Sequence, residues 1–368
     1  MTAAIPNPLA LVAELTHRCP LRCVYCSNPR ELTARGHELS AASWARVFRE
    51  AAELGVLQAD FTGGEPLARP DLTEIIRSAR AAGLYASLIS SGLPLDEKRL
   101  AELVAAGLDH FQLSFQGAEP TAAQEFSGTN THAQKVKVAE WVKRHRVALT
   151  LNFVIHRGNL NQLEEMVALA ERIGPARVEF AHVQYYGWAF ANRARLLPTR
   201  AQLDRSLEIL KSAEERLRGR IKVEYVVPDY YAKYPKPCMG GWGRKVILVK
   251  PDGDVLPCHA ANVLPGIAFD NVERRSLRQI WNESEAFQKY RGVEWMPDLC
   301  RNCERRDQDF GGCRCQAFLL AEDAAATDPV CSLSPGRATV DGILKEANAE
   351  RPVPAAPQPE WIYRPNPA

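Results

Sequence analysis

The sequence predicts an α/β protein, in which a partial barrel of six β/α units precedes a small cysteine-rich domain. Two observations lead to this prediction. Apolar, β-rich stretches alternate with helical patterns as far as residue 217, and the region beyond residue 220 holds seven of the ten cysteines among short strands and turns. Strands that alternate with such helices pair in parallel through right-handed crossovers, and six units in series close part of a barrel.

The hydrophobic periodicity places each element. The expected strands are Leu9–Thr16, Val56–Thr62, Tyr85–Ser90, His110–Phe115, Ala148–Ile155 and Arg177–Gln184. The expected helices are Ala41–Leu54, Leu72–Ala82, Leu95–Ala106, His132–Arg146, Leu160–Ile173 and Arg200–Leu217. Ser40 is a suitable N-cap for the first helix, and Asn161 with Glu164 has the spacing of a capping box. Glycines follow four helix ends, where a left-handed residue costs least: Gly55, Gly83, Gly107 and Gly174.

The pattern changes near Ile221, so we place the barrel at residues 1–220, the cysteine-rich domain at 221–348 and a tail at 349–368. In the second region an Asp252-Gly253 turn between two short apolar stretches predicts a β-hairpin. The tail has six prolines from Arg351 to Ala368, which favours an extended or mobile segment. Its run Trp361-Ile362-Tyr363 is apolar enough to dock on the rest of the chain.

The composition limits the classes of function. A chain of 368 residues is long enough for two or three domains of ~150 residues. Lys and Arg number 46 against 44 for Asp and Glu, a net charge of +2, so we expect neither nucleic acid nor a membrane as a partner. No apolar run reaches the ~18 residues of a membrane span, and Met1–Ala10 lacks the features of a signal peptide. We therefore expect a cytoplasmic protein, where ten cysteines indicate metal or iron–sulfur ligation rather than disulfides.

Three cysteines follow the first expected strand directly, with the spacing Cys19-x3-Cys23-x2-Cys26. They lie in a loop at the carboxyl end of the barrel, where such folds place their active sites. Three thiolates can bind three irons of a [4Fe–4S] cluster and leave the fourth iron open. Zinc is the alternative, because His17 could complete a closed four-ligand site.

This spacing, with the aromatic Tyr25 before the last cysteine, resembles the signature of the radical S-adenosylmethionine (SAM) superfamily. The resemblance implies a [4Fe–4S] cluster whose open iron chelates SAM. Reductive cleavage of SAM would then give a 5′-deoxyadenosyl radical that abstracts a hydrogen from the substrate, while the protein orients and shields the cofactors.

The end of the second expected strand, Gly63-Gly64-Glu65-Pro66, resembles the motif with which this superfamily binds the amino group of SAM. Glycines let backbone carbonyls come close to a ligand, and the last two residues fix the turn. The family pattern also implies SAM contacts from residues on later strands, although each could instead be a satisfied turn or core group: Ser114, Gln116 and Asn152. Ser90 and Ser91, after the third strand, would complete the floor of the site.

The seven later cysteines resemble the SPASM extension of radical SAM enzymes that modify ribosomal peptides, which holds two auxiliary iron–sulfur clusters. The family spacing Cys-x2-Cys-x5-Cys-x3-Cys, laid on Cys300 and Cys303, requires cysteines at positions 309 and 313. Position 309 is Asp in this chain, and a carboxylate is a harder and weaker iron ligand than a thiolate. The resemblance implies one auxiliary cluster, [2Fe–2S] or [4Fe–4S], on Cys238, Cys258, Cys313 and Cys315. It implies a second, [4Fe–4S], on Cys300, Cys303, Asp309 and Cys331. The alternatives are a zinc ribbon and, for Asp309, a solvated loop residue.

Three segments narrow the resemblance to the PqqE family, the PqqA peptide cyclases of pyrroloquinoline quinone (PQQ) biosynthesis: Leu11–Pro29, Val183–Ala189 and Cys303–Ala317. This implies an oxidoreductase that joins a Glu γ-carbon to a Tyr ring carbon within the precursor peptide PqqA. The chaperone PqqD and a reductant such as flavodoxin are the other implied partners, and the auxiliary clusters would accept the electron released. No residue is assigned a catalytic role beyond the cofactor ligands.

The end of the sixth expected strand and the residues after it carry side chains that could receive the peptide at the barrel mouth: His182, Gln184, Tyr185, Tyr186 and Trp188. For Tyr185, Tyr186 and Trp188 the alternative is ordinary aromatic packing under the auxiliary domain. Two other functions compete with the cyclase. One is a sibling SPASM enzyme that makes thioether crosslinks or matures sulfatases. The other is a non-catalytic iron–sulfur carrier, which would have no use for the turn Gly63–Pro66.

Overall fold

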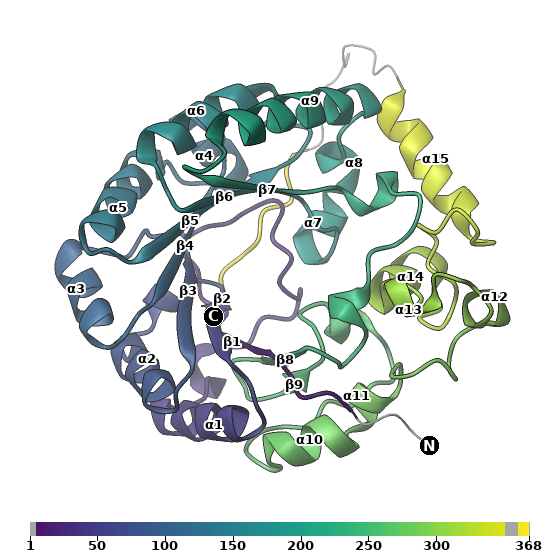
Figure 1. The fold of residues 1–368 in the computed structure, drawn as a ribbon, viewed down its shortest axis with the longest axis horizontal. Coiled ribbons are helices and arrows are strands. Elements are labelled where there is room, and N and C mark those ends of the chain that lie inside the picture. Colours follow the sequence, from purple (N-terminus) through teal and green to yellow (C-terminus); the bar gives the residue numbers. More distant parts are fainter. Residues whose placement is uncertain (1–4, 350–359, 368) are drawn as a thin grey trace.

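A curved sheet of nine strands forms the centre of the molecule, with helices around its outer side (Figure 1). The computed structural model describes residues 5–349 and 360–367. The strand order is β7-β6-β5-β4-β3-β2-β1-β8-β9. All neighbouring strands are parallel except the last pair, β8 and β9. The predicted partial barrel is therefore confirmed.

The strands are β1 (Ala10–Thr16), β2 (Gln58–Gly63), β3 (Tyr85–Ser90), β4 (His110–Phe115), β5 (Ala148–Ile155), β6 (Arg177–His182), β7 (Lys222–Val226), β8 (Val246–Val249) and β9 (Val255–Leu256). The helices of the barrel region are α1 (Ala41–Glu53), α2 (Leu72–Ala81), α3 (Glu97–Ala105), α4 (Pro120–Ser127), α5 (His132–Arg144), α6 (Leu163–Ile173), α7 (Gly187–Ala191), α8 (Arg193–Leu196) and α9 (Arg200–Leu217). The later helices are α10 (Leu277–Glu283), α11 (Glu285–Gln288), α12 (Asp298–Arg301), α13 (Arg306–Asp309), α14 (Arg314–Ala321) and α15 (Arg337–Asn348).

Local signals explain most helix ends. The Ser40 hydroxyl accepts a hydrogen bond from the Ser43 amide at 3.0 Å, as expected of an N-cap. The four glycines that follow helices all have positive φ, between 65° at Gly174 and 104° at Gly107. The capping box predicted at Asn161 was wrong: Leu160–Gln162 forms a 3-10 turn, so Asn161 lies inside that turn and α6 begins only at Leu163.

The sheet extends beyond the six expected strands on both sides. β7 continues the parallel order next to β6, and β8 pairs with β1 from Ala10 opposite Val246 to Ala13 opposite Val249. The hairpin predicted around Asp252-Gly253 is formed by β8 and β9, and Gly253 has a φ of 92°. The cysteine-rich region therefore begins as a continuation of the barrel sheet.

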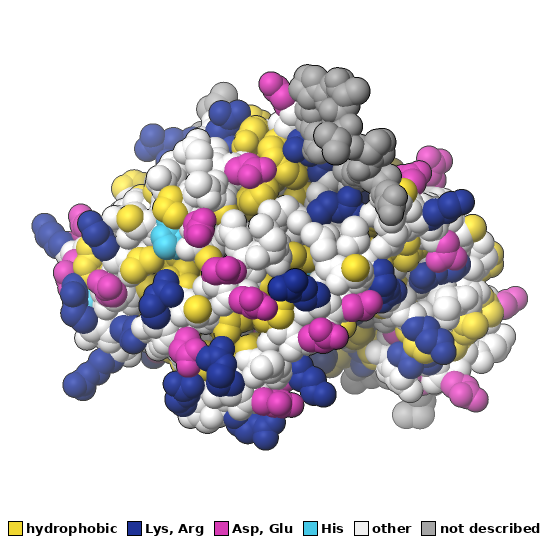
Figure 2. Space-filling model, turned by 90° about the horizontal axis from the view of Figure 1, so that it is seen from above, with side chains coloured by type: hydrophobic (Ala, Val, Ile, Leu, Met, Phe, Trp, Pro, Cys, Tyr) yellow, Lys and Arg dark blue, Asp and Glu magenta, His cyan; other side chains and the backbone are white. Residues whose placement is uncertain are grey.

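Apolar packing between the sheet and the outer helices forms the main core, with Trp44, Phe48 and Phe61 among its fully buried members. A second cluster lies under the cysteine loop and includes Val24 and Phe126. A third cluster surrounds several of the later cysteines. Figure 2 shows basic and acidic side chains interspersed over one face, in agreement with the small net charge. Among the described residues, no helix combines the length and the apolar character that crossing a membrane requires.

Candidate active site

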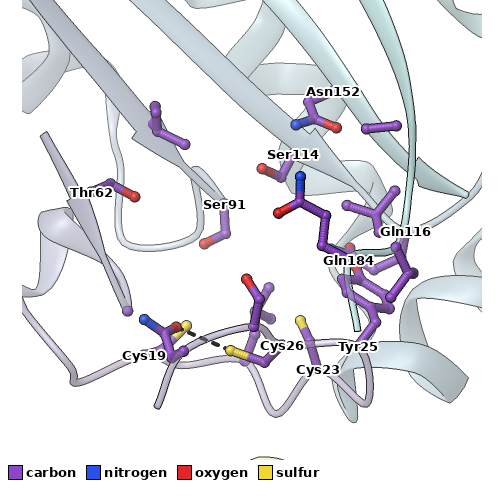
Figure 3. Close-up of a pocket in the computed structure, with 18 of the residues that line it drawn as sticks. Cys19, Cys23, Tyr25, Cys26, Thr62, Ser91, Ser114, Gln116, Asn152 and Gln184 are labelled. Atoms are coloured by element: carbon purple, nitrogen blue, oxygen red, sulfur yellow. Dashed lines mark hydrogen bonds between the residues drawn. The ribbon is translucent and has the colours of Figure 1, made fainter. Parts of the chain in front are cut away.

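A cavity of about 410 Å³ opens at the carboxyl ends of the barrel strands. The three N-terminal cysteines line it from one side, and the ends of β2 to β6 line it from the other (Figure 3). A cavity of this size suits a small-molecule cofactor. The parallel order of the strands explains the arrangement, because it brings all their carboxyl ends to one rim.

The cysteine loop is held by backbone hydrogen bonds on both sides. Val24 donates to the Phe126 carbonyl at 3.1 Å, and Trp188 donates to the Cys26 carbonyl at 3.0 Å. Burial raises the pKa of all three thiols, to about 12 for Cys23. Metal ligation needs thiolates, so binding of a cluster here would release protons. Three thiols facing one cavity fit a [4Fe–4S] cluster with an open iron.

His17 is not brought to these thiols. Its ring is fully buried, Nδ1 accepts a hydrogen bond from the Thr33 amide at 2.8 Å, and Nε2 lies 3.4 Å from the Glu14 carboxylate. Both ring nitrogens therefore face protein partners, which leaves none directed at the cavity for the zinc alternative.

The turn after β2 is pressed against the end of β1. The Gly64 amide donates to the Thr16 carbonyl at 2.6 Å, and Gly63 has a φ of 125°. A Cβ on Gly63 would lie 2.3 Å from the Thr16 carbonyl oxygen, and one on Gly64 would lie 2.5 Å from that of Arg18. Only glycine fits at either position, and both line the cavity.

Glu65 and Pro66, the other two residues of the motif, lie behind the cavity wall rather than in it. The Glu65 carboxylate is fully buried and accepts hydrogen bonds from Ser90, Ser91 and the Leu67 amide. Pro66 is the first residue of a 3-10 turn. Their contribution is to fix the turn that carries the two glycines.

The polar residues predicted at later strand ends do converge on the cavity: Ser90, Ser91, Ser114, Gln116 and Asn152. Figure 3 shows Ser91, Ser114 and Asn152 on the side opposite the cysteine loop, with Gln184 between them and the thiols. Asn152 Oδ1 and His182 Nδ1 are buried and have no hydrogen-bond partner among the described residues. Such atoms are costly without a partner, so the cavity is suited to a polar ligand.

Sequence reasoning missed Lys135, which lies fully buried behind the floor of the cavity. Its ammonium group donates to the Ser114 carbonyl at 2.6 Å and to Gln116 Oε1 at 2.7 Å. Burial lowers its pKa to about 8, while Cys23 and Glu65 favour the charged form. A signal was present: Lys135 occupies the apolar stripe of α5 three, four and seven residues before Val138, Ala139 and Val142.

Four of the later cysteines come together as predicted for the first auxiliary cluster. Cys258 Sγ lies 4.0 Å from Cys315 Sγ, and Cys238 interacts with both Cys258 and Cys313. The Tyr186 hydroxyl lies 3.1 Å from Cys313 Sγ. Hydrogen bonds with Cys238 and Cys315, and then with Tyr186, lower the pKa of Cys313.

The set predicted for the second auxiliary cluster lines one small cavity of about 20 Å³: Cys300, Cys303, Asp309 and Cys331. Asp309 is 8% exposed, so it is not a solvated loop residue. Its carboxylate accepts from the Gly311 amide at 3.1 Å and lies 3.3 Å from Arg305. Within the described parts of the chain, no three His, Cys, Asp or Glu side chains are placed to hold a single metal ion; in a cluster each thiolate binds a different iron.

The aromatic residues after β6 are packed rather than exposed to the cavity. Tyr185 contacts the ring of Tyr230 at 5.1 Å, Tyr186 faces Cys313, and Trp188 is buried beside the cysteine loop. His182 and Gln184 do line the cavity. Of the five side chains predicted to receive the peptide, therefore, these two are placed to meet a substrate, and the neighbouring Val183 also lines the cavity.

Comparison with family models gives two matches. Residues 13–170 match the model of the radical SAM superfamily, and residues 238–304 match the iron–sulfur cluster-binding SPASM domain. The two matches contain the N-terminal cysteine triplet and four of the seven later cysteines, respectively.

Solved structures share the fold. SuiB of Streptococcus suis, bound to S-adenosylmethionine, superposes with a TM-score of 0.73 at 20% identity, over 89% of this chain and 77% of that one. Native anSMEcpe with bound AdoMet gives a TM-score of 0.64 at 15% identity, over 92% of this chain and 97% of that one. At these identities the likeness establishes the fold alone.

Curated relatives are much more similar. The PqqA peptide cyclase of Methylobacterium nodulans is 53% identical over 99% of this chain and 95% of its own length. That of Gluconobacter oxydans is 53% identical over 91% of this chain and 93% of its own length. With this identity over nearly the whole chain, and with both domain models matched, the chain belongs to the PqqA peptide cyclase family of radical SAM enzymes.

Proposed function

We propose that this chain binds SAM through a [4Fe–4S] cluster on Cys19, Cys23 and Cys26 and forms a carbon–carbon bond between Glu and Tyr side chains of PqqA, the first step of PQQ biosynthesis. One observation carries the proposal. The three thiols and the glycine turn Gly63-Gly64 line the same cavity. A non-catalytic iron–sulfur carrier would have no use for that turn.

Each part of the cavity has a task in this proposal. The backbone of Gly63 and Gly64 would bind the amino group of SAM, and Ser114, Gln116 and Asn152 would contact its ribose or carboxylate. Lys135 fixes Gln116 by donating to its side-chain oxygen. When bound, the cofactor would supply the 5′-deoxyadenosyl radical that abstracts the Glu γ-hydrogen. Burial of the surrounding residues would shield that site from water.

When the Tyr ring regains its aromaticity it loses one electron and one proton, and the auxiliary sites would take the electron. We assign Cys238, Cys258, Cys313 and Cys315 to the first cluster and Cys300, Cys303, Asp309 and Cys331 to the second, a [4Fe–4S] cluster. Tyr186 supports the first set by its contact with Cys313. We propose the divisions 1–220, 221–348 and 349–368 as the chemical modules of the chain, although the sheet itself crosses position 220.

For partners we propose PqqA as substrate, PqqD as its chaperone and a flavodoxin-type reductant. The names of the curated relatives support the substrate. A sibling activity is the second candidate, because SuiB, which shares the fold, is known bound to a different precursor peptide, SuiA.

Anaerobic incubation of the reconstituted protein with SAM, a reductant, PqqA and PqqD tests the proposal. We expect 5′-deoxyadenosine and a PqqA product lighter by two hydrogens, with Glu and Tyr tethered in the fragment spectrum. Absence of 5′-deoxyadenosine from reduced, cluster-loaded protein would refute the radical SAM chemistry. Formation of 5′-deoxyadenosine with unchanged PqqA, but with processing of another peptide, would favour the sibling activity.

A further inference from the structure

The C-terminal segment Trp361–Asn366 lies against the cysteine loop, although more than 300 residues separate them in sequence. In Figure 1 this segment runs into the barrel mouth and ends near β1 and β2. The Cys19 amide donates to Asn366 Oδ1 at 3.0 Å. The segment therefore touches the first cluster ligand directly.

The side chain of Asn192 forms hydrogen bonds with both of these segments. It is 4% exposed, and its side-chain amide donates to the Val24 carbonyl at 2.8 Å and to the Ile362 carbonyl at 2.8 Å. Its Oδ1 accepts from the Ile362 amide at 3.1 Å. One buried side chain thus links the cysteine loop to the C-terminal segment.

Two aromatic residues of the segment, Trp361 and Tyr363, make further contacts with the barrel. The Arg195 guanidinium lies 3.6 Å from the centre of the Trp361 ring, a cation–π contact. The Tyr363 hydroxyl donates to the Glu125 carbonyl at 2.8 Å. These contacts belong to α8 and α4, so the segment is anchored to the barrel at several points.

These contacts place Arg364 at the cavity. It is 1% exposed, lines the cavity together with the three thiols, and donates a hydrogen bond to the His17 carbonyl. Its Nε has no hydrogen-bond partner among the described residues. A guanidinium is always charged in proteins, and a buried charge without a carboxylate partner is costly.

The positive charge of Arg364 lies on the same cavity as the three thiols of Cys19, Cys23 and Cys26. A cluster bound by these thiolates would therefore lie beside the guanidinium. A thiolate-ligated cluster is anionic, and reduction adds one more negative charge. A buried cation beside it stabilises the reduced form more than the oxidised form.

We propose that Arg364 is a positioning residue of the SAM-binding site, which the C-terminal segment delivers to the cysteine loop to balance the charge of the cluster and raise its reduction potential. The inference rests on the proposed function in one respect, namely that Cys19, Cys23 and Cys26 hold a [4Fe–4S] cluster. The C-terminal segment would then make the cluster easier to reduce, and a reduced cluster is what the reductive cleavage of SAM requires.

Full-length Arg364→Gln, Arg364→Lys and wild-type protein, reconstituted anaerobically, test this role. The readouts are iron per chain and an EPR-monitored redox titration of each cluster, neither of which needs turnover. We expect Arg364→Gln to shift the midpoint of the N-terminal cluster to more negative potential, or to lose that cluster's iron. Arg364→Lys, which keeps the charge, should stay close to wild type, and the auxiliary signals should be unchanged in both. The exposed Arg218→Gln is the matched control.

An Arg364→Gln protein with the wild-type midpoint and iron content would overturn the proposal. Equal loss of the N-terminal cluster in Arg364→Gln and Arg364→Lys would also overturn it, because packing rather than charge would then be responsible. A wild-type protein that binds no N-terminal cluster would instead refute the proposed function on which the inference rests.

Discussion

The Glu65 carboxylate accepts two hydrogen bonds from Ser91, one from its hydroxyl at 2.5 Å and one from its backbone amide at 2.8 Å. The other carboxylate oxygen accepts from the Ser90 hydroxyl at 2.7 Å. Glu65 thereby ties the turn after β2 to the end of β3, although its own side chain does not face the cavity. The acidic residue of the motif acts here by holding the two glycines in place.

We predict that Glu65→Ala destabilises the protein and weakens SAM binding together. Removing the carboxylate leaves buried donors of Ser90 and Ser91 without an acceptor, at a cost of about 3 kcal/mol. Urea unfolding and SAM-binding titration measure the two effects. Glu74→Ala, at an exposed position of α2, should change neither. Normal stability and SAM affinity in Glu65→Ala would show that the hydrogen bonds do not hold the turn.

A triple substitution of Cys19, Cys23 and Cys26 by Ala should abolish SAM cleavage and leave the auxiliary clusters in place. The two cysteine groups have separate packing: the first lines the cavity at the barrel mouth, whereas the second lies partly around α14 and partly at the small cavity that Asp309 lines. Iron content and EPR of the purified variant, with an assay for 5′-deoxyadenosine, check this. Loss of all iron would mean that the modules are not independent.

Much of the fold could be predicted from sequence because its signals are local. The Ser40 cap, the glycines after helices and the alternation of apolar stretches all depend on residues close in sequence. The division of the cysteines into an N-terminal triplet and a later group of seven is likewise visible in the sequence. The order of the barrel strands then follows from chain connectivity, since consecutive parallel units lie side by side.

The remaining features depend on contacts between distant segments. β8 has four residues, and nothing in its composition shows that it pairs with β1 rather than with a strand of its own region. The Trp361-Ile362-Tyr363 run suggested docking, but its site is defined by Asn192 and Glu125, which carry no recognisable motif. The part of the proline-rich tail at 350–359 and residue 368 lie outside the described residues.

We predict that stability falls as the pH drops below about 6.5, partly through His156 and His182. Burial lowers the pKa of each to about 3. Between pH 3 and 6.5 the unfolded chain binds a proton at each ring and the folded chain does not, so acid favours unfolding. The slope is about 1.4 kcal/mol per pH unit for each histidine.

Urea unfolding at pH 7.5, 6.5 and 5.5 measures this dependence. His156→Gln should reduce the slope by one histidine's share relative to wild type. The exposed His37→Gln should leave the slope unchanged. Equal slopes in wild type and His156→Gln would show that His156 is protonated as readily in the folded chain as in the unfolded one.

We predict that Asp309 is a ligand of the second auxiliary cluster. Its carboxylate shares a cavity with Cys300, Cys303 and Cys331, and it is buried at the end of α13. A carboxylate is a harder ligand than a thiolate, and ligand type tunes the reduction potential of a cluster. Asp309→Cys should therefore keep the second auxiliary cluster but shift its potential and impair turnover, whereas Asp309→Ala should leave one iron without its protein ligand and alter the EPR spectrum. Asp307→Ala, an exposed neighbour on the same short helix, is the control. Unchanged EPR spectra and potentials in both Asp309 variants would rule out ligation, because the carboxylate would then contribute only its hydrogen bond to Gly311 and its ion pair with Arg305.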